Sequence, residues 1–171
     1  MITIITGGRG VGKTTLLLNL IEERKSRCSK VAGILTPAIY DKNGEKPGFY
    51  AMSVINGERW ELGRSDKELE GPSYGPFSFS ERGFDRANEI LAEVLTEGPG
   101  DVFLDEIGPL ELEKGGGFCP VLPLISKFNQ NRKLYLVIRP ELIDTFINRF
   151  ISDKEYRIIE ITSENRDGII I

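Results

Sequence analysis

Residues 7–14 read Gly7-Gly8-Arg9-Gly10-Val11-Gly12-Lys13-Thr14 and fit the phosphate-binding loop pattern G-x-x-x-x-G-K-[ST]. A β-branched run at 2–5 precedes this loop and a leucine-rich stretch at 16–21 follows it, which predicts a strand, the loop and a helix in that order. Because glycine has no Cβ, successive backbone N–H groups can surround a phosphate here, and the helix N-terminus adds partial positive charge. The stretch therefore predicts a phosphate site in an α/β fold, the alternative being a glycine-rich turn that binds nothing.

The side chains of this loop have separate predicted tasks. The Lys13 ammonium would reach the β- and γ-phosphates of a nucleotide as a point charge, and the Thr14 hydroxyl would ligate a Mg²⁺ that bridges the same oxygens. Arg9 would either touch a phosphate or remain solvated. The residues of this loop predicted to contact the nucleotide are Gly8, Arg9, Gly10, Val11, Gly12, Lys13, Thr14 and Thr15.

The composition indicates one domain and narrows the partners. The 171 residues, 40% of them hydrophobic, suffice for one core, so a single domain over 1–171 is predicted. The net charge of −4 comes from 22 basic and 26 acidic residues without a long run of either sign, which argues against a nucleic-acid partner. No apolar stretch approaches the roughly 20 residues that span a bilayer, and Met1 leads directly into the first strand, so a cytoplasmic protein is expected. We expect a monomer or a weak oligomer.

The chain contains no histidine and two cysteines, Cys28 and Cys119. The absence of histidine excludes any His-based acid, nucleophile or metal centre. The cysteines are far apart and form no C-x-x-C unit, so we interpret both as packing thiols. Carboxylates, lysine, arginine and Mg²⁺ are left to carry the chemistry.

Apolar strands alternate with helical patterns along the remaining chain. Strands are predicted at 31–35, 101–105, 134–138 and 157–161, helices at 81–96, 119–130 and 141–150, a loop with one short extended piece at 67–79, and a last strand or tail at 169–171. The alternation predicts an α/β, three-layer P-loop fold with a mostly parallel sheet.

An antiparallel β-hairpin is predicted at about 47–64, inserted after the second strand. Asn56-Gly57 is the dipeptide best suited to the two positive-φ positions of a type I′ turn. The predicted opposite pairs are Ser53 with Trp60 and Ala51 with Leu62.

Asp105-Glu106 ends the apolar strand predicted at 101–105, the place of a Walker B element. Asp105 would hold Mg²⁺ through water, opposite Thr14, and Glu106 would accept a proton from, or orient, a water attacking the γ-phosphoryl group. The alternative is that both carboxylates cap the following turn. A Glu directly after the Asp favours hydrolysis, because a kinase acceptor is a bound group rather than water.

Several motifs together resemble the THEP1 family of nucleoside-triphosphatases, over nearly the whole chain. The matching pieces are 10–15 of the P-loop, Gly33-Ile34-Leu35-Thr36, Gly48-Phe49, Tyr74, Asp105-Glu106-Ile107-Gly108 with Glu111, and Thr162-Ser163-Glu164-Asn165-Arg166-Asp167. The resemblance implies a RecA-like P-loop fold and Mg²⁺-dependent hydrolysis of ATP, GTP and related triphosphates to diphosphates, with loose base selectivity.

The chain departs from the family pattern at Pro109-Leu110, where the family has Lys-Met. Any phosphate contact by that lysine is missing here, so an arginine would take its place. Arg139, at the end of the strand after Walker B, is the candidate catalytic arginine, the alternative being a surface residue beside a helix-starting proline. Glu111 would be either functional or bonded to a backbone amide.

The late motif is predicted to contact the base. Asn165 and Arg166 lie in a loop after the last strand, and a guanidinium stacked on a purine would not distinguish adenine from guanine. Tyr74 and Phe77 would alternatively clamp the base or pack as satellite aromatics.

Three functions share these residues. The favoured one is an NTP phosphohydrolase that uses Lys13, Thr14, Asp105 and Glu106. The second is a kinase for a nucleotide or small metabolite, with an acceptor lid carrying Arg64, Arg82 and Arg86. The third is a nucleotide-dependent adaptor with slow hydrolysis, for which Gly115-Gly116-Gly117 would be a hinge.

Overall fold

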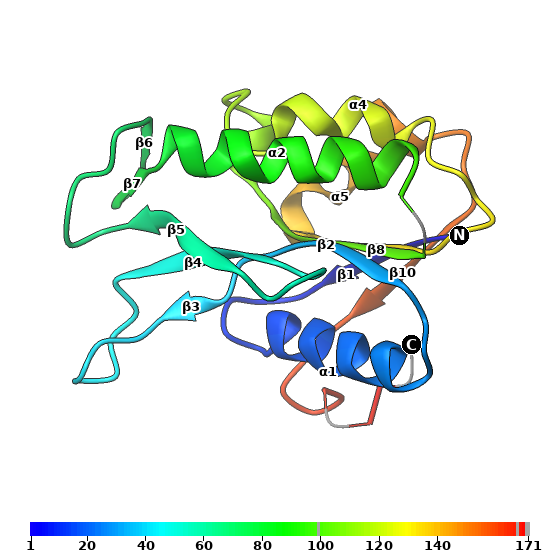
Figure 1. The fold of residues 1–171 in the computed structure, drawn as a ribbon, viewed down its shortest axis with the longest axis horizontal. Coiled ribbons are helices and arrows are strands. Elements are labelled where there is room, and N and C mark those ends of the chain that lie inside the picture. Colours follow the sequence, from blue (N-terminus) through cyan, green and yellow to red (C-terminus); the bar gives the residue numbers. More distant parts are fainter. Residues whose placement is uncertain (99, 167, 170–171) are drawn as a thin grey trace.

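The computed structural model describes residues 1–98, 100–166 and 168–169. One half of its sheet is parallel, and these strands are β1 (Ile2–Thr6), β2 (Val31–Leu35), β8 (Asp101–Ile107), β9 (Leu134–Ile138) and β10 (Tyr156–Glu160). The other half is antiparallel and consists of β3 (Ala38–Ile39), β4 (Gly48–Ser53), β5 (Arg59–Arg64), β6 (Ser73–Tyr74) and β7 (Phe77–Phe79). The order is β10-β1-β9-β8-β2-β4-β5-β7-β6, with β3 paired to β4 (Figure 1).

Helices cover both faces of the parallel half. They are α1 (Lys13–Ser26), α2 (Glu81–Thr96), α3 (Pro109–Leu112), α4 (Leu122–Ile125) and α5 (Ile143–Phe146). Figure 1 shows α1 on one face and α2, α4 and α5 on the other. This arrangement confirms the predicted three-layer α/β fold. Within the described ranges, no helix has the length and apolar character needed to cross a membrane.

Alternation along β1 divides the core between the two faces. Ile4 belongs to the cluster that contains Leu91 of α2, and Ile5 belongs to the cluster that contains Leu17 of α1. All four side chains are fully buried. Because successive side chains of a strand point to opposite faces, the short run in β1 anchors both helical layers and fixes where the following loop leaves the sheet.

The predicted hairpin forms from β4 and β5, but with a different register. Ala51 lies opposite Trp60 rather than Leu62, a shift of two residues. A shift of two leaves each side chain on its predicted face, and both Ala51 and Leu62 are fully buried. The two predicted pairs, Ser53 with Trp60 and Ala51 with Leu62, are therefore wrong.

The cause lies in the turn of the hairpin. The Val54 side chain is buried, and its amide donates to the Gly33 carbonyl of β2 at 3.0 Å, so Val54 leaves the hairpin ladder. Gly57 takes a φ of +74°, whereas Asn56 does not adopt the positive φ that a two-residue type I′ turn requires there. The loop is therefore longer than Asn56-Gly57.

The segment 67–79, predicted as a loop with one short extended piece, forms two short strands, β6 and β7. β7 pairs antiparallel with β5, and the Phe77 ring packs edge-on against Phe49 with centroids 5.5 Å apart. Phe77 and Tyr74 are both packed against the hydrophobic core, as in the satellite-packing alternative. The hairpin is thus part of a larger antiparallel extension.

The helix predicted at 119–130 is interrupted. A 3₁₀ turn at Cys119–Val121 leads into the one-turn α4, and the chain then continues in turns such as Phe128 N–H to Ile125 C=O. Pro120 and Pro123 lack the amides that a regular helix needs, which explains the short segments. After β9, a 3₁₀ turn (Pro140–Leu142), α5 and a π-helical turn (Ile147–Ile151) form the predicted helix. Of the predicted strand or tail at 169–171, residues 170–171 lie outside the described residues.

Candidate functional site

The P-loop connects the carboxyl end of β1 to the N-terminus of α1, at the edge where the parallel strands end. Gly7 has a φ of +135°, and a Cβ there would lie 2.2 Å from the Ile161 carbonyl oxygen. Gly12, which precedes the helix, has a φ of +103°. Glycine is therefore required at the two ends of the loop, by close approach at one and by left-handed backbone at both.

The Lys13 side chain folds back over this loop. Its Nζ donates to the Gly7 carbonyl at 2.8 Å and to the Gly8 carbonyl at 2.6 Å. Desolvation lowers the pKa of Lys13, while the nearby charges of Glu106 and Asp105 act in the opposite direction. The ammonium thus lies over the loop, close enough to Glu106 and Asp105 for their charges to act on it, and a bound phosphate would compete for its hydrogen bonds.

Asp105 is fully buried and its two carboxylate oxygens differ. Oδ2 accepts a hydrogen bond from the Thr14 hydroxyl at 2.8 Å, whereas Oδ1 is buried without a hydrogen-bond partner among the described residues. Burial, and next to it the charge of Glu106, raises the pKa of Asp105. An unpaired buried oxygen beside a threonine hydroxyl matches the oxygen ligands of a hard divalent cation.

The carboxylates of the site do not form a complete cage. The described part of the chain contains no group of three or more His, Cys, Asp or Glu side chains placed to hold a metal. A cation at Asp105 and Thr14 would therefore need phosphate oxygens and water for most of its shell, as is usual for Mg²⁺ in nucleotide sites.

Glu106 projects from a β-bulge at the end of β8. The pairing of β8 with β9 is regular up to Leu104 and resumes at Ile107, with an irregularity between them. Glu106 has a φ of +69°, uncommon for a residue other than glycine, and its side chain is exposed between buried neighbours. The bulge therefore turns this carboxylate out of the sheet toward the site, as bulges near active sites commonly do.

Arg139 follows β9 and meets Glu106 at this edge. Its Nη2 donates to Glu106 Oε1 at 3.1 Å, and its amide donates to the Ile107 carbonyl at 3.4 Å. A Cβ on Gly108 would lie 3.3 Å from Arg139 Nε, so the guanidinium lies close to that backbone. Two residues that the sequence singled out for separate reasons are thus an ion pair.

Glu111 stabilises the segment that follows β8 by accepting hydrogen bonds from two of its backbone amides. Its carboxylate accepts from the Gly108 amide at 2.8 Å and from the Phe118 amide at 3.4 Å. Burial raises the pKa of Glu111 to about 7. A Cβ on Gly117 would lie 2.0 Å from Glu111 Oε1, so this glycine packs against the carboxylate. These contacts match the amide-bonding alternative, and they tie down part of the predicted 115–117 hinge.

The remaining predicted contacts occupy different places. Asn165 bonds within its own loop, to the Glu160 carbonyl and the Thr162 amide at 2.9 and 2.8 Å. The Arg166 side chain lies beside the P-loop, with Cδ 3.9 Å from the Cβ position of Gly12. Among the other predicted residues of the P-loop, Val11 packs against the α1 side of the core, and four are exposed: Gly8, Arg9, Gly10 and Thr15. Asp167 of the late motif lies outside the described residues.

Two residues near the site were missed or noticed only through the resemblance. Thr36, at the end of β2, donates to Asp105 Oδ2 from both its amide and its hydroxyl, each at 3.1 Å. Lys46, before β4, carries a charge close enough to contribute to the lowered pKa of Lys13. The adjacency of β2 and β8 brings Thr36 to the site, and a threonine directly after a buried strand was the available sign.

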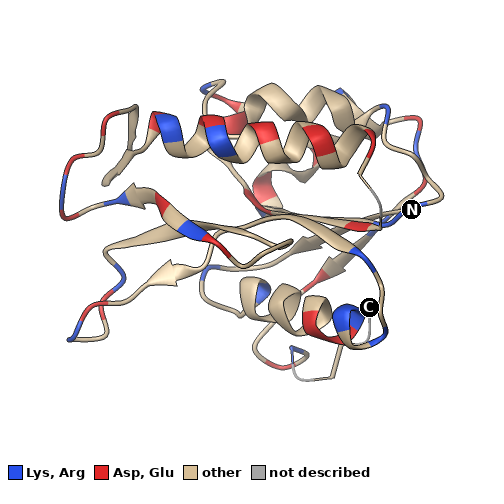
Figure 2. Cartoon of the chain, viewed as in Figure 1, with Lys and Arg blue, Asp and Glu red and all other residues tan. Residues whose placement is uncertain are grey.

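Two of the three arginines of the predicted acceptor lid are engaged elsewhere, and the third, Arg82, is exposed on α2. Arg64 forms ion pairs with Glu61 and Asp66, and Arg86 pairs with Glu58 and lies over the Trp60 ring at 4.3 Å. Figure 2 shows basic and acidic residues interspersed over the elements in view, with both signs on α2. The extension therefore does not present the cluster of uncommitted cations that the kinase alternative requires.

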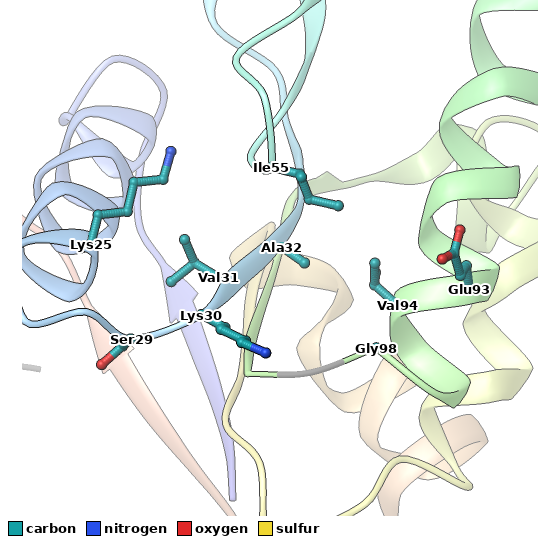
Figure 3. Close-up of a pocket in the computed structure, with 9 residues that line it drawn as sticks. All are labelled: Lys25, Ser29, Lys30, Val31, Ala32, Ile55, Glu93, Val94 and Gly98. Carbon is teal, nitrogen blue, oxygen red and sulfur yellow. The ribbon is translucent and has the colours of Figure 1, made fainter.

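A pocket of about 320 Å³ lies at the other end of the sheet (Figure 3). Lys25 at the end of α1, Val31 at the start of β2 and Val94 near the end of α2 line it. Val31 is paired with Asp101, the first residue of β8, whereas Asp105 lies at the opposite end of that strand. This pocket is separate from the P-loop.

Comparison with known proteins agrees with this geometry. The model of a family described as NTPase matches residues 2–171. The chain belongs to this NTPase family. The match confirms the family that the motifs predicted, a family of nucleoside-triphosphatases.

Individual NTPase family members support the assignment. The nucleoside-triphosphatase THEP1 of Saccharolobus solfataricus is 31% identical over 166 residues, which cover 96% of this chain and 86% of that protein. THEP1 of Sulfolobus acidocaldarius is 30% identical over 97% of this chain and 87% of its own. The crystal structure of THEP1 from Aquifex aeolicus has a TM-score of 0.75 at 26% identity, covering 99% of this chain and 94% of that one. The fold class predicted from the sequence is thereby confirmed.

Proposed function

We propose that this NTPase family member hydrolyses nucleoside triphosphates to nucleoside diphosphates and phosphate, depends on Mg²⁺, and accepts several bases. The observation that carries the proposal is the arrangement around Asp105. A buried carboxylate with one unpaired oxygen lies beside the P-loop threonine, and Glu106 is turned outward from the next position. Membership in a family of nucleoside-triphosphatases supports the same reaction.

The triphosphate would bind to the P-loop amides and Lys13. Lys13 Nζ would exchange the Gly7 and Gly8 carbonyls for oxygens of the β- and γ-phosphates. The ammonium is charged in both states, but the phosphate oxygens are anionic, so the exchange adds the attraction between opposite charges. Binding energy at this position would therefore depend on the ammonium.

Thr14 and Asp105 would hold the Mg²⁺, with Thr14 as a ligand and Asp105 Oδ1 directed at it through water. When bound, the cation would neutralise charge on the phosphate oxygens. The chain's contribution is the hydroxyl oxygen of Thr14 and the fully buried carboxylate of Asp105.

Glu106 would accept a proton as a water oxygen bonds to the γ-phosphorus and the bond to the β–γ bridging oxygen breaks. Arg139, the cationic partner of Glu106, would move its hydrogen bonds to the γ-phosphate, which carries more negative charge than one carboxylate. Binding of the triphosphate would thereby free the Glu106 carboxylate to act on the water. It would also place the positive charge of Arg139 beside the γ-phosphate.

Base contacts would come from the loop beside the P-loop. Arg166 would lie against the base, and Asn165 would shape the loop rather than read the base, since its side-chain oxygen and nitrogen are both hydrogen-bonded within it. A planar guanidinium stacks on any base, so this contact supports broad specificity.

One assay tests the reaction type. Purified protein is incubated with Mg²⁺ and ATP, GTP, CTP or UTP, with and without nucleosides and nucleoside monophosphates, while phosphate and diphosphate products are followed. We expect phosphate release that needs Mg²⁺, occurs with all four nucleotides and is unaffected by the added acceptors. Turnover that requires an acceptor would instead establish the kinase alternative.

A further inference from the structure

Three hydrogen bonds converge on one oxygen of Asp105. Oδ2 accepts from the Thr14 hydroxyl at 2.8 Å and from the amide and the hydroxyl of Thr36, each at 3.1 Å. Oδ1, on the same buried carboxylate, accepts none among the described residues. All the donors among the described residues thus act on one oxygen of the carboxylate, and the other oxygen keeps its hydrogen-bonding capacity unused.

Thr36 is suited to fix the orientation of this carboxylate. The terminal torsion of an aspartate is soft, so a single hydrogen bond leaves the plane of the group free to turn. The Thr14 hydroxyl cannot supply the restraint alone, because the proposed cation would use the same oxygen. Thr36 offers two donors from one residue, and its own position is set by backbone on both sides: Leu35 pairs with Met52, and the Pro37 carbonyl accepts from the Tyr50 amide at 3.0 Å.

We propose that Thr36 is a positioning residue that holds Asp105 with Oδ1 turned toward the cation. Thr36 touches neither nucleotide nor cation, and it acts through Asp105 alone. The inference rests on the proposed function for the presence of a cation beside Thr14 and Asp105. It adds that the junction between the parallel and antiparallel halves of the sheet, where Thr36 lies, determines the geometry of the metal site.

Three variants separate this role from general stability. Thr36→Val removes the hydroxyl and keeps the β-branched shape, while Thr36→Ser keeps the hydroxyl and removes the methyl group. Thr3→Val is the matched control, because Thr3 is likewise a buried threonine and its hydroxyl oxygen accepts from Arg157 Nε at 3.1 Å, away from the site.

The measurement is Mn²⁺ binding to the ADP complex, followed by electron paramagnetic resonance, with ADP affinity in EDTA measured in parallel. Replacing a residue that orients a metal ligand weakens metal binding by roughly 10- to 100-fold. We expect Thr36→Val to raise the Mn²⁺ dissociation constant by at least about tenfold. Thr36→Ser and Thr3→Val should stay near wild type, and ADP affinity in EDTA should be the same in all four proteins.

Wild-type Mn²⁺ affinity in Thr36→Val would overturn the proposal, as would an equal loss in Thr36→Ser. Loss of ADP affinity in EDTA by Thr36→Val would also overturn it, since the effect would then be collapse of the site. Because the readout is Mn²⁺ binding and not hydrolysis, failure of the proposed function can be distinguished from failure of the proposal for Thr36. It would appear as wild-type protein that binds Mn²⁺ and ADP normally but releases no phosphate from NTPs.

Discussion

Arg139 Nη2 donates to Glu106 Oε1 at 3.1 Å, which joins the proposed proton acceptor to the proposed catalytic cation. The pair forms because the bulge in β8 turns Glu106 out of the sheet and β9 ends beside it, with Arg139 bonded to Ile107. While this ion pair is intact, Glu106 Oε1 already accepts a hydrogen bond from the guanidinium. We therefore expect the γ-phosphate to compete for the guanidinium before Glu106 acts on water.

Replacing Arg139 should slow hydrolysis more than it weakens nucleotide binding. In Arg139→Gln we expect kcat to fall by roughly 100-fold or more, since cationic side chains at the transferring phosphoryl group are worth about 10³- to 10⁵-fold in related reactions. KM for ATP should change by less than about tenfold, because most contacts to the triphosphate remain. Steady-state phosphate release measures both constants. Arg27→Gln, an exposed change at the end of α1, is the control, and equal kcat values in the two variants would remove Arg139 from catalysis.

Glu106 should lower the free energy of unfolding, because its backbone conformation is unfavourable for a residue with a Cβ. A φ of +69° strains a residue with a Cβ, at a cost on the order of 1–3 kcal/mol, and glycine does not carry that cost. Glu106→Gly should therefore raise the free energy of unfolding by about 1 kcal/mol while abolishing hydrolysis. Urea denaturation with a phosphate assay tests both parts. The control is Glu113→Gly, because Glu113 is exposed and has a negative φ just after α3, so glycine should lower the free energy of unfolding there. A similar loss of stability in both variants would mean that the bulge is unstrained.

Lys13 should contribute to triphosphate affinity itself. Lys13→Ala removes an ammonium that lies over the P-loop, and a hydrogen bond to a charged group contributes about 1.5–3 kcal/mol. We expect the dissociation constant of a non-hydrolysable ATP analogue with Mg²⁺ to rise by roughly 10- to 100-fold in calorimetry. Lys25→Ala, at the far end of α1, is the control. Unchanged affinity in Lys13→Ala would refute the phosphate geometry.

Glu111 should make stability depend on pH. Its pKa rises from 4.5 to about 7 on folding, so the folded state holds the proton more tightly than the unfolded state. The corresponding stability is present below the unfolded pKa and is lost as pH rises through about 7, by at most about 3 kcal/mol. Glu111→Gln should flatten the urea-denaturation profile between about pH 5 and about pH 8. Glu113→Gln, which is exposed, should follow wild type; parallel profiles for wild type and Glu111→Gln would contradict the assignment.

Much of the architecture could be read from local patterns. The strand at 31–35 and the helix at 81–96 have the predicted bounds, because a short apolar run and an apolar helical periodicity act over a few residues. The hairpin register could not be read, because it depends on a hydrogen bond from Val54 to Gly33 in another strand. Turn chemistry at Asn56-Gly57 was outweighed by that contact.

The site likewise has features that could be predicted from local sequence and features that could not. Lys13, Thr14 and Asp105 could be predicted as site residues from motif spacing and from the strands that precede them. The left-handed backbone of Glu106 depends on how β8 realigns with β9, and Thr36 meets Asp105 from 69 positions away in the chain. The backbone of Glu106 has no local pattern, and the position of Thr36 after a buried strand does not identify its partner, so pairwise geometry within the site required the folded structure.

The central claim is that Glu106 takes the proton from water after Mg²⁺ and the triphosphate have bound to other residues. Glu106→Gln keeps the shape and removes the proton acceptor, so single-turnover hydrolysis of Mg·ATP measured beside Mg·ATP affinity tests it most directly. We expect the hydrolysis rate to fall by at least about 100-fold, the lower range for general-base catalysis, with affinity near wild type. Hydrolysis at the wild-type rate in Glu106→Gln would show that Glu106 is not the proton acceptor.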